Sequence, residues 1–182
     1  GYDGFNCTMP LKTEMAALAD EISEEARILR SVNTVAIRDG RFIADTTDGG
    51  GIILTIKRAL GQTDLRGIRV VLLGAGGAAR SAALSVTLAG AKLTILNRTL
   101  ETAESLSLLL DCKADCLTLT NANLVECARD ADIIINCTSL GMTGQPGFAS
   151  LDFIGRLPKR ALVIDAVYNP LETELLKAAA WN

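Results

Sequence analysis

The feature that most restricts the fold is a glycine-rich turn directly after an apolar run. The run is Val70–Leu73, and the turn reads Gly74-Ala75-Gly76-Gly77-Ala78-Ala79, a GxGxxA pattern. The first glycine permits a tight bend, the second lets backbone approach a pyrophosphate, and the small last residue lets the helix pack on the strand. The free N–H groups of the next helix attract phosphate. The pattern predicts a dinucleotide site at Gly74, Ala75, Gly76, Gly77 and Ala78.

From residue 68 onward, short apolar runs alternate with segments of helical periodicity. Predicted strands cover 69–73, 92–96, 116–119, 132–136 and 161–165, and predicted helices cover 78–89, 100–110, 121–127 and 172–180. Runs that are apolar throughout are typical of a parallel sheet covered on both faces. We therefore expect an α/β fold, with a Rossmann-like doubly wound parallel sheet over residues 62–182.

Residues 1–61 show a different pattern. Apolar positions spaced by three and four predict a helix over 12–30, and two alternating runs around Asp39-Gly40 predict a hairpin over 31–45. A second helix over 48–60 begins with three glycines and is closed by Gly61. We expect part of a smaller α/β domain and a linking helix over 1–61, with the boundary in 62–67.

The composition excludes several classes of function. The chain has no histidine, which rules out a Ser-His-Asp triad, a Cys-His pair and a histidine-bearing metal site. Its 18 Lys and Arg against 21 Asp and Glu form no basic run, so we expect no nucleic acid partner. No apolar run approaches the roughly 18 residues of a spanning helix, so we expect no membrane segment. Five cysteines without a CxxC pair indicate reduced thiols of a cytoplasmic protein and no metal site.

The end of the second predicted strand indicates which dinucleotide would bind. An NAD-binding domain usually places an acid there to hold the ribose hydroxyls. This chain has Asn97, Arg98 and Thr99 instead. A guanidinium binds a 2′-phosphate with paired, charge-assisted hydrogen bonds, whereas a carboxylate would repel it. These residues favour NADP, although Arg98 is also compatible with a solvated charge and Thr99 with a helix cap.

Polar residues gather in three stretches of the first region: Asn6–Lys12, Asn33 and Asp45–Gly50. Their side chains offer hydrogen bonds for a polyhydroxylated substrate and groups for acid–base chemistry. Spacing alone leaves two interpretations open, a shared site or separate surface loops and helix caps.

Seven stretches also form an ordered set: Asn6–Lys12, Ser31–Thr34, Thr46–Gly49, Gly74–Arg80, Asn97–Thr99, Asn136–Met142 and Asp165–Pro170. In this order they resemble the motifs NVTxPxK, AVNT, NTDG, GAGGAxR, NRT, NATSxGM and DxxYxP of the shikimate dehydrogenase family. The resemblance extends over nearly the whole chain. It implies an NADP-dependent oxidoreductase that interconverts shikimate and 3-dehydroshikimate in aromatic amino acid biosynthesis, acting as a monomer or homodimer.

The resemblance also implies roles for individual residues. Lys12 and Asp48 would be the catalytic pair in a substrate-binding first domain. The implied substrate contacts are Thr8, Asn33, Asp48 and Tyr168. The implied neighbours of the nicotinamide are Thr138, Ser139 and Met142. Hydride transfer to a nicotinamide requires a group that takes the hydroxyl proton. Burial weakens a lysine's hold on its proton and a neighbouring carboxylate strengthens it, so which of the pair carries the proton stays open.

Departures from the family pattern leave the substrate open. Thr46 stands where the family has Asn, and Cys7 stands where it has Val. The family's N-terminal SxSP motif and C-terminal helix have no counterpart in the sequence. A chain of this extent is expected to bind the cofactor and to show weak or absent turnover. Two alternatives remain: a quinate/shikimate dehydrogenase of broader specificity, and a non-catalytic nucleotide-binding remnant.

Overall fold

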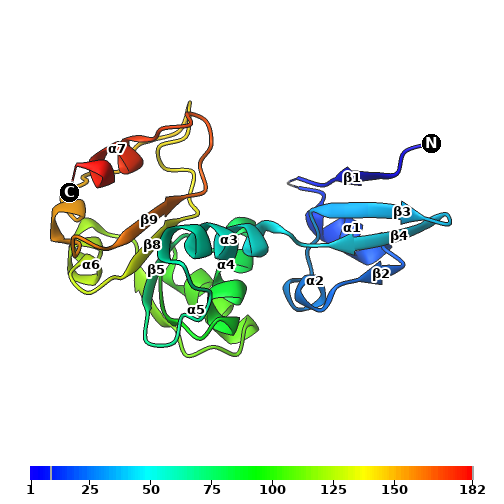
Figure 1. The fold of residues 1–182 in the computed structure, drawn as a ribbon, viewed down its shortest axis with the longest axis horizontal. Coiled ribbons are helices and arrows are strands. Elements are labelled where there is room, and N and C mark those ends of the chain that lie inside the picture. The colour runs from blue at the N-terminus through cyan, green and yellow to red at the C-terminus, as the bar shows by residue number, and fades with distance from the viewer. Residues whose placement is uncertain (9, 182) are drawn as a thin grey trace.

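The computed structural model describes residues 1–8 and 10–181. Met9, inside the motif Asn6–Lys12, and Asn182, the last residue of the predicted second domain, lie outside the described residues. Figure 1 shows two lobes, one formed by the N-terminal residues to about 45 and the other by the chain from residue 48 onward. The chain passes between the lobes once, just before residue 48.

The first lobe is a four-stranded sheet with two short helices. Its elements are β1 (Gly4–Asn6), α1 (Lys12–Leu18), β2 (Glu21–Ile22), α2 (Glu24–Leu29), β3 (Thr34–Arg38) and β4 (Arg41–Asp45). The strand order is β1-β3-β4-β2, with β2 parallel to β4 and the other pairs antiparallel. The predicted hairpin is confirmed: Asp39 and Gly40 have φ of 52° and 76°, the positive values that a tight two-residue turn requires.

The continuous helix predicted over 12–30 is wrong. The backbone becomes extended at Ala19, and Glu21–Ile22 pairs with Ile43 and Ala44 of β4. A new helix then begins because the Ser23 hydroxyl accepts a hydrogen bond from the Ala26 N–H. Met15 and Ala26 belong to one buried cluster, with Ile22 packed against it. The apolar spacing therefore continues across the break although the helix does not.

The second lobe contains the expected parallel sheet. Its strands are β5 (Arg69–Leu73), β6 (Lys92–Asn97), β7 (Asp115–Thr118), β8 (Ile133–Asn136) and β9 (Leu162–Asp165). Their order is β7-β6-β5-β8-β9, and every neighbouring pair is parallel. The helices are α3 (Asp48–Leu60), α4 (Gly77–Leu88), α5 (Leu100–Leu109), α6 (Asn121–Ala128) and α7 (Glu174–Ala180), with a short 3₁₀ helix, η1 (Ile154–Arg156). The predicted Rossmann-like doubly wound fold is confirmed.

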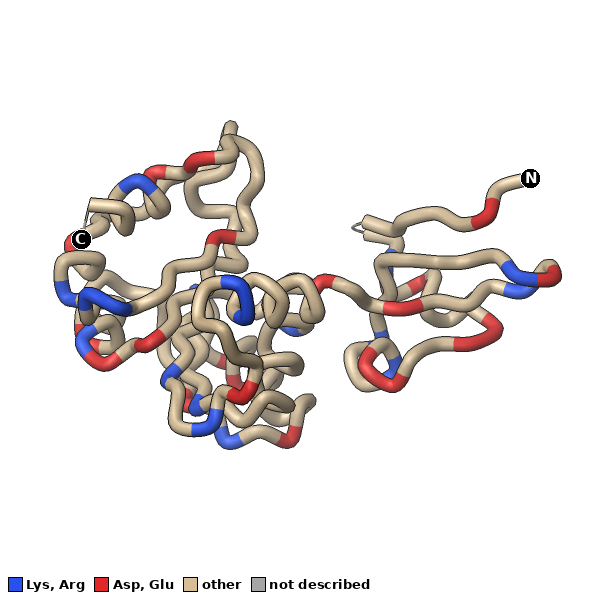
Figure 2. The backbone as a smooth tube through the Cα atoms, in the orientation of Figure 1, with Lys and Arg blue, Asp and Glu red and all other residues tan. Residues whose placement is uncertain are grey.

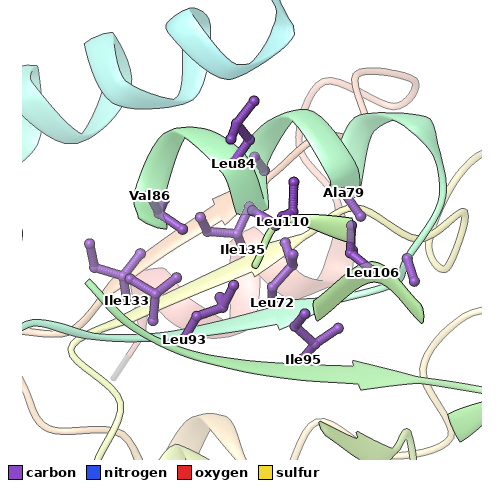
Figure 3. Close-up of a cluster of buried hydrophobic side chains, with 14 of the residues drawn as sticks. Leu72, Ala79, Leu84, Val86, Leu93, Ile95, Leu106, Leu110, Ile133 and Ile135 are labelled. Carbon is purple, nitrogen blue, oxygen red and sulfur yellow. The ribbon is translucent and has the colours of Figure 1, made fainter. Parts of the chain in front are cut away.

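Two apolar clusters cover the two faces of this sheet. On one face α4 and α5 pack over alternate strand residues; Figure 3 shows Leu72, Leu93 and Ile95 beneath the helical Ala79 and Val86. On the other face α6, η1 and α7 bury Leu73 and Ile134. This burial of both faces explains why the strands are apolar throughout.

Helix α3 joins the lobes. Its bounds match the predicted helix, and Ile56 is fully buried in the cluster beneath α4. Gly49 lies against α4, and the hydroxyls of Thr46 and Ser81 lie 3.3 Å apart in a buried contact. Although the boundary at residue 61 assigns α3 to the first domain, the helix packs into the second lobe. That domain boundary stays a prediction.

The remaining differences concern element ends and short elements. Helix α7 begins at Glu174 rather than 172, because the Thr173 hydroxyl accepts from the Leu176 N–H and caps it there. Strands β1 and β2 and helix η1 were not expected. Figure 2 shows acidic and basic residues dispersed over both lobes. Within residues 1–8 and 10–181, no helix has the length and apolar character needed to cross a bilayer.

Candidate active site and cofactor cleft

An ion pair joins the first residue of α1 to the first residue of α3. The Lys12 Nζ lies 2.8 Å from the Asp48 Oδ2, across 36 residues of sequence. The side chains are 24% and 35% exposed, so the pair is partly shielded from water while remaining accessible to a ligand. Lys12 lies close to the start of the hairpin because the Val32 N–H donates a hydrogen bond to the Lys12 carbonyl. The structure thus brings the two predicted catalytic residues together.

Asn33 holds the other oxygen of this carboxylate. Its Nδ2 donates to the Asp48 Oδ1 at 2.5 Å. Its Oδ1 accepts from the Thr34 hydroxyl and from both the N–H and the hydroxyl of Thr47, at 3.0 to 3.2 Å. Because three donors face this oxygen, the amide must turn its NH₂ group toward Asp48. The acid is therefore held on both oxygens, by a cation and by an oriented amide.

The two other predicted substrate residues belong to other segments of the chain. Thr8 is exposed in the turn before α1, where its carbonyl accepts from the Leu11 N–H at 2.9 Å. Tyr168 follows β9 and is 82% exposed. The hydrogen bonds that hold Lys12, Asn33 and Asp48 do not include it. The roles of Thr8 and Tyr168 stay predictions.

A cleft of about 670 Å³ opens at the carboxyl ends of the parallel strands. Eight of the predicted cofactor residues line it: Gly74, Ala75, Gly76, Asn97, Arg98, Thr99, Thr138 and Ser139. The three others, which are Gly77, Ala78 and Met142, are not among its lining residues. Gly77 and Ala78 form the first turn of α4, and Met142 is 37% exposed beyond the lining segment.

The glycine turn combines a positive φ angle with open space beside its backbone. Gly74 has φ +102°, and a Cβ placed there would lie 3.1 Å from the Cys137 carbonyl oxygen. Positions 76 and 77 face open space, with no atom within 4 Å of an added Cβ. The turn leads into the 12-residue helix α4, whose first N–H groups lack partners within the helix. Backbone donors and free space therefore meet at the cleft.

Arg98 gives this cleft a cation without a carboxylate partner. Its side chain is exposed, and no ion pair joins it to an acid of the described residues. The neighbouring Asn97 donates its amide to the Thr99 carbonyl at 2.9 Å. The cap considered for Thr99 is not formed: it occupies the N-cap of α5, but its side chain makes no capping hydrogen bond. An anionic group on a ligand would find Arg98 available.

Leu140, within the stretch 138–142 expected near the nicotinamide, also lines the cleft. The other lining residues were missed by the sequence analysis: Thr102, Leu119, Thr120, Asn121, Leu124, Cys137, Gly147, Phe148, Ala149 and Ser150. Those at 119–121 reach the cleft because β7 lies beside β6, so its carboxyl end borders the same edge. The polar Thr120-Asn121 after a predicted strand was a usable signal, but only together with the strand order.

Two other features define what this site lacks. Burial, together with the charges of Asp165 and Asp48, raises the pKa of the Cys137 thiol to about 12. The thiol therefore stays protonated near neutral pH and is unsuited to nucleophilic chemistry. Within the described part of the chain, no group of three or more acidic or cysteine side chains is arranged to hold a metal ion.

A second cavity, of about 680 Å³, lies at the amino ends of the strands, near Arg69, Lys92 and Asp115.

Comparisons with known proteins agree with this arrangement. Residues 1–35 match the family model "Shikimate dehydrogenase substrate binding domain", and residues 56–142 match "Shikimate / quinate 5-dehydrogenase". A curated relative, the shikimate dehydrogenase (NADP(+)) of Alkaliphilus oremlandii, is 38% identical over 98% of this chain and 64% of its own length. The chain thus spans about 64% of the curated relatives it matches.

Two solved structures share the fold of the whole chain. Quinate dehydrogenase from Corynebacterium glutamicum, in complex with NAD, has a TM-score of 0.84 at 32% sequence identity. The match covers 100% of this chain and 64% of the quinate dehydrogenase chain. Shikimate 5-dehydrogenase from Thermus thermophilus, in complex with NADP(H) and shikimate, has a TM-score of 0.79 at 30% identity, covering 100% and 64%. With the Lys12–Asp48 pair joining the two lobes and the glycine turn at the cleft of the second lobe, these matches establish that the chain belongs to the shikimate dehydrogenase family.

Proposed function

We propose that this protein is an oxidoreductase that interconverts shikimate and 3-dehydroshikimate with NADP. The observation that carries the proposal is the ion pair of Lys12 with Asp48, held by Asn33, in a chain whose second lobe presents a cleft lined by the glycine turn. The curated relatives at 38 and 39% identity are shikimate dehydrogenases (NADP(+)), which supports the substrate and the cofactor.

The residues present fit a bound NADP. The turn at Gly74 and Gly76 and the first N–H groups of α4 would hold its pyrophosphate, and Arg98 with Thr99 would hold its 2′-phosphate. Thr138 and Ser139 would lie along the remainder of the cofactor. When bound, the nicotinamide supplies the hydride acceptor or donor.

The Lys12–Asp48 pair would accept and return the proton of the substrate hydroxyl. Lys12 has three N–H positions and gives one to Asp48, which leaves the others available to a ligand. Asp48 receives Lys12 on one oxygen and Asn33 on the other, so its position is fixed while the proton moves. With no histidine in the chain, the pair acts as one coupled acid–base unit.

Quinate is a second candidate substrate. It is supported by the structural match to a quinate dehydrogenase and by the family model, which covers both activities. The quinate dehydrogenase structure contains NAD, whereas Arg98 here favours a phosphate on the ribose. The four combinations of shikimate or quinate with NADP or NAD therefore separate the two candidates.

The test is a rate measurement on protein expressed from its complete reading frame. We expect shikimate to reduce NADP, followed as NADPH absorbance, faster than quinate reduces NAD. Lys12→Ala should lower kcat by about 100-fold or more, the range of a lost acid–base group, and leave the NADP Kd within about twofold. Lys57→Ala is the matched control, since Lys57 is exposed in the last turn of α3. A Lys12→Ala protein that keeps most of its turnover would remove Lys12 from the chemistry, and NADP binding without turnover on either acid would favour a non-catalytic protein.

A further inference from the structure

A buried polar network lies behind the cofactor cleft. Asn136 ends β8 and Asp165 ends β9, and the two residues are register partners in the parallel sheet. Asn136 is fully buried, and Thr173, which joins the network from the start of α7, is 1% exposed. Polar groups at such depth are costly unless each finds a partner, so the direction of every hydrogen bond here is constrained.

Asp165 sets these directions because its carboxylate only accepts hydrogen bonds. Its Oδ1 accepts from the Asn136 Nδ2 at 2.9 Å and from the Val167 N–H at 3.0 Å. Its Oδ2 accepts from the Thr173 hydroxyl at 2.6 Å. Asn136 is therefore obliged to turn its NH₂ group toward Asp165 and its carbonyl oxygen the other way.

That carbonyl oxygen holds the chain segment at the cleft. The Asn136 Oδ1 accepts from the Thr138 N–H at 3.1 Å and from the Thr138 hydroxyl at 2.7 Å. The same hydroxyl accepts from the Leu140 N–H at 3.1 Å, and the Asn136 Nδ2 also donates to the Leu140 carbonyl at 3.3 Å. A reversed amide would set its NH₂ group against the two Thr138 donors. The fold of residues 137–140, all of which line the cleft, thus depends on the orientation of one amide.

We propose that Asp165 is a positioning residue: it fixes the orientation of the Asn136 amide and, through it, the backbone of residues 137–140 along the cofactor cleft. The proposal rests on the proposed function only where it concerns the cofactor. Asp165 does not line the cleft and acts entirely through Asn136. Thr173 supports it from α7, whose first turn it caps.

The test first measures order in the free protein. Hydrogen exchange, followed by mass spectrometry, is compared for peptides covering 137–142 and 100–109 in three variants. Asp165→Ala removes every acceptor, and we expect exchange at 137–142 to rise about tenfold or more, the effect of losing a hydrogen bond to a charged group. Asp165→Asn keeps an acceptor for Asn136 and should stay within about threefold of wild type. Thr173→Val should give a smaller increase in exchange than Asp165→Ala, and it also keeps the comparison possible if Asp165→Ala does not fold.

The second measurement is the NADP Kd by calorimetry. We expect it to rise about tenfold in Asp165→Ala and to recover in Asp165→Asn, while the shikimate Kd stays unchanged. Ser23→Ala is the matched control, because Ser23 also caps a helix and donates to an aspartate, Asp45, in the other lobe. Unchanged exchange at 137–142 in both Asp165→Ala and Thr173→Val overturns the proposal, as does an Asp165→Asn protein as perturbed as Asp165→Ala. A wild-type protein that does not bind NADP overturns the proposed function instead, and the exchange data still decide the role of Asp165.

Discussion

The three consecutive glycines that follow Asp48 in the first turn of α3 should respond differently to alanine substitution: the change should destabilise the protein at Gly49 and stabilise it at Gly50. A Cβ on Gly49 would lie 2.1 Å from the Ser85 Oγ and 2.6 Å from the Ser81 carbonyl oxygen. Gly50 and Gly51 have no atom within 4 Å of the same position. The sequence treats the three alike, whereas the structure packs only Gly49 against α4.

The loss of stability expected for Gly49→Ala depends on which of the two contacting oxygens is able to move away from the new Cβ. Ser85 is able to rotate its hydroxyl away, but the Ser81 oxygen belongs to the α4 backbone, so α3 itself has to shift. That shift disturbs the buried Thr46–Ser81 contact and the packing of Ile56. Overpacking of this kind costs about 1–3 kcal/mol of the free energy of unfolding. Gly50→Ala instead stabilises the helix by about 0.5–1 kcal/mol, because alanine loses less conformational freedom on folding.

Urea unfolding of the two variants and the wild type measures this difference. We expect the unfolding midpoints in the order Gly50→Ala, wild type, Gly49→Ala, with about 1.5–4 kcal/mol of unfolding free energy between the extremes. Gly49→Ala should also lower turnover, since Asp48 precedes it and would shift relative to Lys12. A Gly49→Ala midpoint equal to or above that of Gly50→Ala would refute the packing argument.

Other predictions concern the cleft and the site. Arg98→Ala should raise the NADP Kd about 10- to 100-fold and leave the NAD Kd within about twofold, as measured by calorimetry; equal losses for both cofactors would contradict the 2′-phosphate role. The pKa of Cys137 is raised by burial, so the folded thiol keeps its proton while the unfolded thiol ionises. The stability that the folded protein gains by keeping this thiol protonated is complete below about pH 9 and is lost between about pH 9 and pH 12. Urea unfolding at several pH values should therefore show a shallower fall of the unfolding free energy with pH in Cys137→Ala. Asn33→Ala should lower kcat with little change in NADP affinity, because Asp48 loses its amide partner; unchanged kcat would argue against that role.

Local chemistry explains what the sequence predicted well. The hairpin turn and the end of α3 require positive φ values, and the sequence places Asp39-Gly40 and Gly61, residue types that tolerate them, at these positions; both elements were predicted and found. The strands of the second lobe depend on apolar runs long enough to read directly. The break between α1 and α2 was missed because Ile22 and Ala26 keep the helical spacing although Glu21 and Ile22 pair with β4.

The site was less predictable because it depends on contacts between distant segments. Spacing alone did not decide whether Lys12, Asn33 and Asp48 meet; that depends on how α1, the hairpin and α3 pack. The residues at 119–121 reach the cleft only through the strand order β7-β6-β5. Likewise, the Asn136–Asp165 contact depends on the register of β8 with β9, which no local signal specifies.

The attachment of α3 has a consequence for motion between the lobes. Asp48 stands at the start of a helix anchored by Ile56 in the second lobe, whereas Lys12 and Asn33 belong to the first lobe. Any rotation that opens the molecule pulls the acid away from its two partners. The two hydrogen bonds of Asp48 therefore also hold the lobes together, and on the proposed function an opened molecule would separate the acid from the lysine with which it would act.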